Sequence, residues 1–400
     1  MQTQLAEFVR GTPQGESAEA ILRKCVHCGF CTATCPTYQL LGNELDGPRG
    51  RIYLIKQVLE GQEPTKRTQL HLDRCLTCRS CETTCPSGVQ YGQLLDIGRE
   101  VIEEKVQRTL LERLIRRLFV LLLPNYLLTK PGFVVGQMVR PIMPKLLRKS
   151  IPEKQRVGKR PKVQHARKMV IHRGCVQRAA RPSINAAAAR YLDLQSISAV
   201  EVRDGCCGAL GLHLGDRKFL ETNARRNIDA WWNQIQDGAE AIISTASGCG
   251  VTIKQYGELM KHDPQYAQRA ELIASRVIDL SEVEMKAQYE RTAEQPSKVA
   301  IHTPCTLQHG QKVTGSIEKI MERFGIETSF VANSHLCCGS AGVYSILQAD
   351  IAGQLLANRI DALEKELPEC IVTANIGCLM HLDSASSVPV KHWVEVVAPP

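Results

Sequence analysis

Aromatic side chains are scarce in this sequence. Phe, Trp and Tyr together make up 5% of its 400 residues. Proteins that bind sugars or single-stranded nucleic acids stack their ligands on aromatic side chains, so the composition disfavours both classes. No recognition motif accompanies the basic residues either, and we expect no nucleic-acid partner.

Long apolar runs are also missing. The uncharged stretch in the Leu-rich part of the chain covers the 12 residues 118–129 and contains Pro124. A helix needs about 20 apolar residues to cross a bilayer, so we expect no transmembrane helix. The opening segment MQTQLAEFVRGTPQGESAEA lacks the apolar core of a signal peptide. These features predict a cytoplasmic protein.

Nucleotide-binding fingerprints are absent as well. No G-x-G-x-x-G follows a β-type run, and there is no P-loop. We therefore expect no flavin on this chain, and organic redox chemistry would need another subunit. Cysteine, in contrast, is plentiful, with 17 residues. In a reducing cytosol such cysteines are more often ligands or redox groups than disulfide bridges.

Two short segments concentrate cysteine. Residues 25–36 read CVHCGFCTATCP and residues 75–86 read CLTCRSCETTCP, so both match C-x2-C-x2-C-x3-C-P. In this ferredoxin pattern the first three cysteines of a run bind one 4Fe–4S cluster and the fourth binds the other. The predicted ligands are Cys25, Cys28, Cys31 and Cys85 for one cluster and Cys75, Cys78, Cys81 and Cys35 for the other.

Structural zinc is the alternative, because paired C-x2-C motifs also hold zinc. Zinc gives no reason for the third cysteine or the closing Cys-Pro of both runs, so we favour iron–sulfur clusters. Between the runs, residues 48–61 place Ile52, Ile55 and Leu59 at helical spacing, with Gly61 as a stop. This helical connection resembles the α-helical ferredoxin domains of respiratory dehydrogenases.

The second half of the chain contains an internal repeat. Each copy has a β-type run before its first cysteine (MVIHRGC at 169–175, VAIHTPC at 299–305), a CCG between helical stretches, and a β-branched run before its last cysteine. Alternating strands and helices predict a parallel sheet, and cysteines at the strand ends should gather at one edge. The matched cysteines are Cys175, Cys206, Cys207 and Cys249 in one copy and Cys305, Cys337, Cys338 and Cys378 in the other.

The predicted fold class is α+β multidomain, with an α-helical ferredoxin domain followed by two pseudo-two-fold related α/β CCG lobes. Each lobe is expected to bind one further iron–sulfur or metal centre, with reactive thiols or a purely structural role as alternatives. The expected domains are residues 1–104 (ferredoxin domain), 105–168 (basic Leu-rich helical connector), 169–297 (first CCG domain) and 298–400 (second CCG domain).

The spacings C-x30-CCG-x40-C and C-x31-CCG-x38-C, behind two ferredoxin runs, resemble the cysteine-rich CCG domain. This domain occurs in heterodisulfide reductases, in the anchor subunit of anaerobic glycerol-3-phosphate dehydrogenase and in glycolate oxidase iron–sulfur subunits. The stretches CVHCGFCTATCPTYQLLGNELDGPRGRIYLIKQVLEG and IVTANIGCLMHL are most similar to the glycolate oxidase family.

The resemblance implies an electron-transfer subunit of a flavin-dependent 2-hydroxy-acid dehydrogenase that oxidises glycolate and also D-lactate. It implies a flavin-binding catalytic subunit and a second flavoprotein-like subunit as partners, and quinone or another membrane-associated acceptor. Two alternatives remain: a heterodisulfide-reductase-like subunit with chemistry at a CCG site, or the anchor subunit of a glycerol-3-phosphate or lactate dehydrogenase.

This chain departs from the fuller CCG pattern, which ends in C-x-x-C. Thr252 and His381 stand where the fifth cysteine would be. His381 is either an additional ligand or an ordinary polar surface residue. His172 and His302 recur three residues before Cys175 and Cys305, which suggests hydrogen bonding to cluster sulfur or packing at a strand end. Cys370 has no counterpart and is expected to be a buried core thiol.

Basic residues are concentrated in residues 101–168, with 17 Lys/Arg against 4 Asp/Glu. Within them, Leu110, Leu111, Leu114, Ile115, Leu118 and Leu122 form an apolar stripe beside several arginines. The stripe is expected to pack against a partner or the chain's own domains. The alternative, supported by the basic run 145–168, is a helix lying on the anionic inner face of the cytoplasmic membrane.

Overall fold

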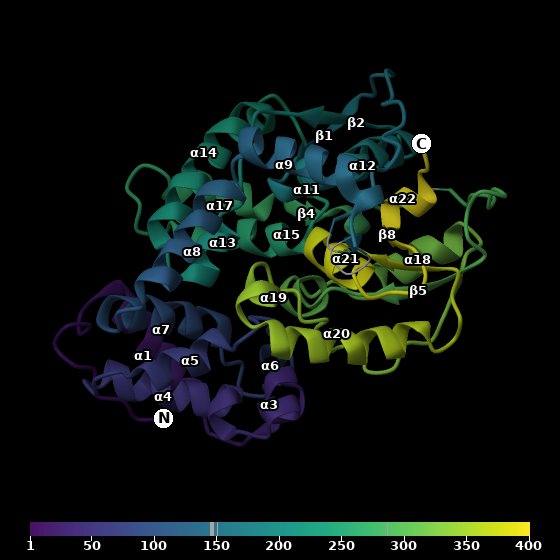
Figure 1. Ribbon diagram of the computed structural model, residues 1–400. Helices are drawn as coiled ribbons and strands as arrows, with labels where there is room; N and C mark the ends of the chain where they lie inside the picture. The colour runs from purple at the N-terminus through teal and green to yellow at the C-terminus, as the bar shows by residue number, and fades with distance from the viewer. Residues whose placement is uncertain (145–147, 150, 286) are drawn as a thin grey trace.

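The computed structural model describes residues 1–144, 148–149, 151–285 and 287–400. It consists of a helical N-terminal part, a pair of connector helices and two α/β lobes (Figure 1). This arrangement confirms the predicted α+β multidomain fold class. Lys145, the first residue of the basic run, lies outside the described residues.

The N-terminal part is built only of helices over its first 105 residues. The predicted helix between the cysteine runs is α4, and its buried Ile55 packs against the closely approaching Gly98 of α7. Each cysteine run follows a longer helix, α1 or α5, and contains a very short one, α2 or α6. The elements are α1 (Pro13–Lys24), α2 (Phe30–Ala33), α3 (Pro36–Leu41), η1 (Glu44–Asp46), α4 (Pro48–Leu59), α5 (Lys66–Asp73), α6 (Ser80–Thr83) and α7 (Tyr91–Lys105).

The first lobe has a parallel four-stranded sheet in the order β2-β1-β3-β4. Its apolar strands are covered by helices on both faces, as βαβ crossovers require. The strands are β1 (Arg167–His172), β2 (Ile197–Glu201), β3 (Ile242–Ser244) and β4 (Val277–Asp279). The helices are α11 (Val176–Ala180), α12 (Ser183–Leu194), α13 (Ala209–Leu214), α14 (Arg217–Gln236), α15 (Ser247–Ile253), α16 (Tyr256–Leu259), α17 (Ala267–Ser275) and η3 (Leu280–Glu282).

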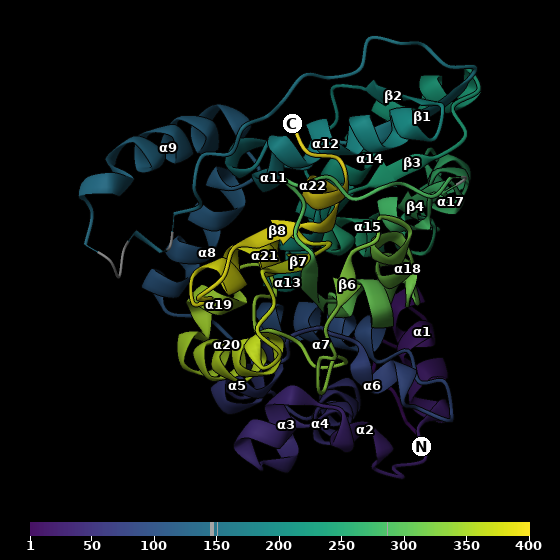
Figure 2. The same ribbon diagram turned by 90° about the vertical axis from the view of Figure 1, so that its right-hand side faces the viewer.

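The second lobe repeats this topology with the parallel order β6-β5-β7-β8. One hydrophobic core contains residues of both sheets, among them Ile171 and Ile371, so the lobes pack as a pair (Figure 2). The strands are β5 (Lys298–His302), β6 (Glu327–Thr328), β7 (Cys370–Thr373) and β8 (Val390–His392). The helices are the π-helix η4 (Thr306–Gly310), α18 (Ser316–Arg323), α19 (Tyr344–Leu347), α20 (Ala349–Glu364), α21 (Ile376–Asp383) and α22 (Trp393–Val397).

The connector helices α8 (Leu110–Leu122) and α9 (Tyr126–Val139), followed by η2 (Arg140–Ile142), lie at one side of the molecule (Figure 2). Neither α8 nor α9 has a buried residue, and Leu110 and Leu127 are 77% and 79% exposed. Most of the stripe is therefore not covered by the chain's own domains, and packing against a partner stays a prediction. An amphipathic pattern predicts an apolar face, but does not tell which surface covers it.

No single helix among the described residues is long and apolar enough to cross a membrane. The segments Leu110–Leu122 and Tyr126–Ile142 meet that criterion only when taken together, and they bend by 95° where they join. We refer to this pair of segments as the hairpin.

Candidate metal centres

The first ferredoxin quartet surrounds one pocket near the surface. Cys25, Cys28 and Cys31 line it together with Cys85, which comes from the second run. Burial and the neighbouring Cys25 raise the pKa of the Cys31 thiol to about 11. The structure thus brings together the four cysteines that the ferredoxin pattern assigns to one cluster, and leaves Cys28 exposed.

The second ferredoxin quartet is more deeply placed. Burial raises the pKa of both Cys78 and Cys81, and nearby thiols, including Cys75 and Cys35, raise it further. Polar groups point at the sulfurs: the Tyr91 hydroxyl lies 3.5 Å from Cys75 Sγ. The sequence grouped these four cysteines, but it gave no sign of the tyrosine.

The two runs share an unusual backbone. His27 and Gly29 in the first run, and Thr77 and Arg79 at the matching positions of the second, all have positive φ. A β-branched residue such as Thr77 rarely adopts this conformation, which costs roughly 1–2 kcal/mol. Such a loop persists where its surroundings impose it, and a cluster bound to three cysteines of the loop would do so.

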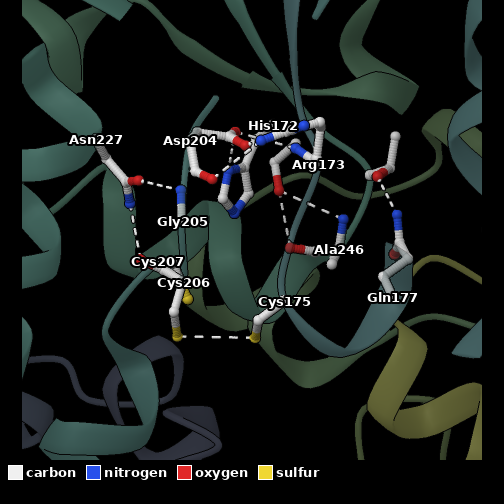
Figure 3. Close-up of polar contacts among 12 residues, drawn as sticks. His172, Arg173, Cys175, Gln177, Asp204, Gly205, Cys206, Cys207, Asn227 and Ala246 are labelled. Carbon is white, nitrogen blue, oxygen red and sulfur yellow. Dashed lines mark hydrogen bonds and ion pairs between the residues drawn. The ribbon is translucent and has the colours of Figure 1, made fainter. Parts of the chain in front are cut away.

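The first CCG quartet gathers at the carboxyl edge of its sheet. Cys175 Sγ lies 3.7 Å from Cys206 Sγ (Figure 3). The thiol of Cys207 contacts both Cys206 and Cys249. The Asn227 side chain accepts from the Gly205 amide and donates to the Cys206 carbonyl, which fixes the CCG segment.

Among the described residues, His172 and two sulfurs of this lobe do not form a group of ligand atoms within 4.8 Å of one another. Nδ1 of His172 lies 2.8 Å from Asp204 (Figure 3). The ring packs edge-on against Trp231. Hydrogen bonds with His172 and Arg173 outweigh the effect of burial and lower the pKa of Asp204. Of the two interpretations for this histidine, packing at a strand end is the one the structure supports.

The second CCG quartet has the same arrangement with a different neighbour. Cys305 Sγ lies 3.8 Å from Cys337 Sγ, and Cys338 contacts both Cys337 and Cys378. A ring nitrogen of His302 and the sulfurs of Cys338 and Cys378 all lie within 4.8 Å of one another. Burial, then Arg359 and His381, lower the pKa of His302 to about 3, so the ring is neutral.

The third residue of each CCG must be glycine for two reasons: its backbone has a positive φ, and there is no room for a side chain. Gly208 and Gly339 have φ values of +88° and +91°, and a side chain would meet α14 at the first position and α20 at the second. Each amide also lies 3.4 Å from the sulfur of the first cysteine of its CCG. The glycine therefore lets α14 or α20 approach closely while its N–H faces sulfur.

Gly339→Ala is expected to lower the melting temperature by about 4 °C or more, because a Cβ would lie 2.8 Å from the Ala352 carbonyl oxygen. Gly353→Ala in the same helix α20 is the control, since a Cβ at that position would have no neighbouring atom within 4 Å. Differential scanning fluorimetry under anaerobic conditions compares the two. Equal melting temperatures would refute the steric argument.

One cavity of about 540 Å³ lies between the lobes, and it is lined by the whole first CCG quartet and by Cys305, Cys337 and Cys378 of the second. Cys78 of the ferredoxin part lies at its wall and packs in one cluster with Cys305 and Cys337. Direct hydrogen bonds hold the parts together, among them Arg79 to Gln255 at 2.9 Å and the Tyr344 hydroxyl to the Arg74 carbonyl at 3.0 Å. The second ferredoxin quartet is thus adjacent to the second CCG quartet, which sequence spacing could not have indicated.

Comparison with known proteins agrees with this geometry. A 4Fe-4S dicluster domain profile matches residues 21–89, and a cysteine-rich domain profile matches residues 169–254 and 299–383. The glycolate oxidase iron-sulfur subunit of Escherichia coli strain K12 is 51% identical over 99% of this chain and 98% of its own length. The chain belongs to the glycolate oxidase iron–sulfur subunit family.

Other relatives are more distant. The probable glycolate oxidase iron-sulfur subunit of Bacillus subtilis is 30% identical over 94% of this chain and 90% of its own. Lactate utilization protein A of Bacillus licheniformis is 24% identical over 48% of this chain and 82% of its own. A crystal structure of a Helicobacter pylori protein, with a TM-score of 0.54 at 9% identity, covers 98% of this chain and 74% of its own and shares the fold.

Membership in the glycolate oxidase iron–sulfur subunit family confirms the predicted family, the oxidoreductase-subunit role and the electron-transfer function. The donor sets fit iron–sulfur clusters. None of the 17 cysteines is in a disulfide, and buried thiols with raised pKa values become thiolates once a metal replaces their protons.

Three further residues singled out in the sequence have different environments in the structure. Cys370 is buried in β7 within the shared core, which confirms the prediction of a core thiol. His381 is half-buried on α21 and lines the cavity, so it is not an ordinary surface residue. Thr252 donates to the Gly248 carbonyl one helical turn earlier and has no cysteine-like role.

Proposed function

We propose that this chain carries single electrons from the flavin of a partner subunit, where a 2-hydroxy acid such as glycolate or D-lactate is oxidised, towards membrane quinone. The observation that carries the proposal is the continuous series of thiol quartets. It begins at the exposed Cys28, passes through Cys81 and Cys78, and continues to Cys305 beside the inter-lobe cavity.

The eight ferredoxin-type cysteines would hold two 4Fe–4S clusters, and the two CCG quartets would hold further metal centres. Bound 4Fe–4S clusters accept and release one electron at a time. The chain's own residues set the surroundings of these centres. Buried Arg51 and Arg99 lie next to the second quartet, and their positive charge favours an added electron there.

The surface beside the first quartet suits the flavin-binding partner. Val26 and Phe30 flank Cys28 and are 69% and 60% exposed, although both are apolar. Apolar side chains around an exposed cysteine ligand are the kind of surface that a partner covers. Electrons would arrive here, and a second flavoprotein-like subunit would complete the complex.

The inter-lobe cavity suits the quinone. Leu123 and Phe133 of the connector line it, so it opens beside the exposed apolar hairpin. Reduction of a quinone to a quinol takes two electrons and two protons. Asp96 and His213 also line the cavity, and burial raises the pKa of Asp96 to about 6, so this carboxyl can exchange a proton near neutral pH.

The hairpin would rest on the anionic face of the cytoplasmic membrane. Its apolar side chains are exposed, and Arg113 and Arg117 flank them. An amphipathic segment with basic flanks binds anionic lipid through apolar burial and charge together.

The proposed function is tested in the anaerobic complex with its flavin subunits. Glycolate added without quinone should bleach the visible iron–sulfur absorption and produce reduced-cluster signals in electron paramagnetic resonance. Adding a short-chain quinone should then restore the oxidised spectrum. Reduction by dithionite but not by glycolate would contradict the proposal, because it would separate these centres from the flavin.

A further inference from the structure

The two CCG lobes differ at one pair of matched histidines. His172 precedes Cys175 and His302 precedes Cys305 by the same three residues. In the first lobe Nδ1 of His172 pairs with the Asp204 carboxylate at 2.8 Å. In the second lobe His335 stands two residues before the CCG, where the first has Asp204, so no carboxylate is available there.

His302 is buried without a partner. Its side chain is 1% exposed, and neither ring nitrogen has a hydrogen-bond partner among the described residues. A buried polar group without a partner costs roughly 1–3 kcal/mol, so two such atoms on one ring need a reason. A ring nitrogen of His302 lies within 4.8 Å of both Cys338 Sγ and Cys378 Sγ.

A second asymmetry concerns charge. Arg359 on α20 stands where α14 has the neutral Asn227, and it is also buried, at 3% exposure. It donates to the carbonyls of Asn333 and Leu336, and it makes no ion pair with a carboxylate among the described residues. Cys337 and Cys338 are the acidic groups that act on its charge. A buried cation needs a counter-charge, and metal-bound thiolates would supply it.

We propose that His302 donates a ring nitrogen to the metal that Cys338 and Cys378 bind, so that the second CCG centre has mixed nitrogen and sulfur ligands. In the first lobe Asp204 occupies Nδ1 of His172, and we expect that centre to have thiolate ligands only. The inference rests on the proposed metal centre in the second lobe. Ligand atoms on one tetrahedral ion lie roughly 3.5–4 Å apart. The ring nitrogen of His302 and the sulfurs of Cys338 and Cys378 would therefore reach binding distance after side-chain shifts of about 1 Å.

The consequence is a division of roles between two sites of the same fold. A neutral imidazole in place of a thiolate lowers the negative charge of a centre and favours its reduced state, as the buried Arg359 also does. The second centre, next to Cys78, would therefore be the more easily reduced of the two. The same ligand set also suits a single zinc ion, and the experiment separates the two metals.

The test uses the full chain purified anaerobically from cells grown with ¹⁵N-histidine. Iron and zinc are counted first. If the second lobe holds iron, pulsed electron paramagnetic resonance should show a strongly coupled histidine nitrogen. If it holds zinc, X-ray absorption at the zinc edge should show one nitrogen beside the sulfurs. His302→Gln should abolish either signal, and the matched His172→Gln should leave it unchanged.

His302→Cys distinguishes the loss of the nitrogen ligand from a folding defect, because a thiol can replace the imidazole as a metal ligand. It should keep the metal count and lose the nitrogen signal. Metal in the second lobe without a histidine nitrogen, or a signal that survives in His302→Gln, would overturn the inference but not the metal centre. A chain with two 4Fe–4S clusters and no other metal would instead overturn the proposed CCG centre itself.

Discussion

Cys78→Ser should reduce electron transfer from glycolate to quinone about 100-fold or more in the reconstituted complex, because the loss of a thiolate ligand removes the centre in the middle of the path. Cys78 is buried, belongs to the second quartet and packs against Cys305 and Cys337. Reduction of an artificial dye directly at the flavin should stay at the wild-type rate. Stopped-flow absorbance with both acceptors measures the two rates.

Cys370→Ser is the matched control for this experiment. Cys370 is buried like Cys78, but it lies in β7 within the core. It belongs to neither ferredoxin quartet and does not line the inter-lobe cavity. It should lower thermal stability and leave quinone reduction close to the wild-type rate. Undiminished quinone reduction in Cys78→Ser would show that electrons bypass the second quartet.

Replacing four exposed apolar side chains of the hairpin by serine should weaken binding to anionic vesicles about 1,000-fold. Leu111, Leu121, Leu127 and Met138 are each at least 65% exposed. Burying such a side chain is worth roughly 1.5–3 kcal/mol when complete, so partial burial in lipid at about 1 kcal/mol each gives a combined effect near 4 kcal/mol. Vesicle co-sedimentation at low ionic strength measures the change.

Leu367→Ser is the control for the hairpin variant, because Leu367 is 86% exposed but lies far along the chain, after α20. It should bind vesicles like the wild type. Binding should also weaken with added salt and with zwitterionic lipid, since the arginines of α8 contribute through charge. A hairpin variant that keeps vesicle binding but loses a flavin subunit would identify the surface as a protein interface.

Local patterns in the sequence predicted much of the fold. The ferredoxin pattern assigns the fourth cysteine of each C-x2-C-x2-C-x3-C-P run to the other cluster, and the alternation of strands and helices places the CCG cysteines at one edge of each sheet. The grouping of Cys85 with the first run and of Cys35 with the second appears in the structure for this reason. The parallel sheets followed from the alternation of strands and helices.

The remaining features depend on tertiary contacts that no local pattern encodes. The proximity of Cys78 to Cys305 arises from docking of the helical part against the lobes. The exposed hairpin has the same apolar periodicity as a buried helix, so the pattern could not tell packing against the chain's own domains from packing against a partner or a membrane. His172 and His302 occupy matching positions in the repeat, but Asp204 contacts His172, whereas His302 lies near the sulfurs of Cys338 and Cys378.

The central claim is that this chain holds iron–sulfur clusters on its two ferredoxin-type quartets, and anaerobic metal analysis tests it most directly. Iron, acid-labile sulfide and zinc are counted per chain, and the reduced protein is examined by electron paramagnetic resonance. We expect about eight iron atoms and as many sulfides from the two 4Fe–4S clusters alone, and the two clusters should interact magnetically. Any metal on the CCG quartets would add to this count. Two or more zinc ions with no iron and no visible absorption would contradict the account.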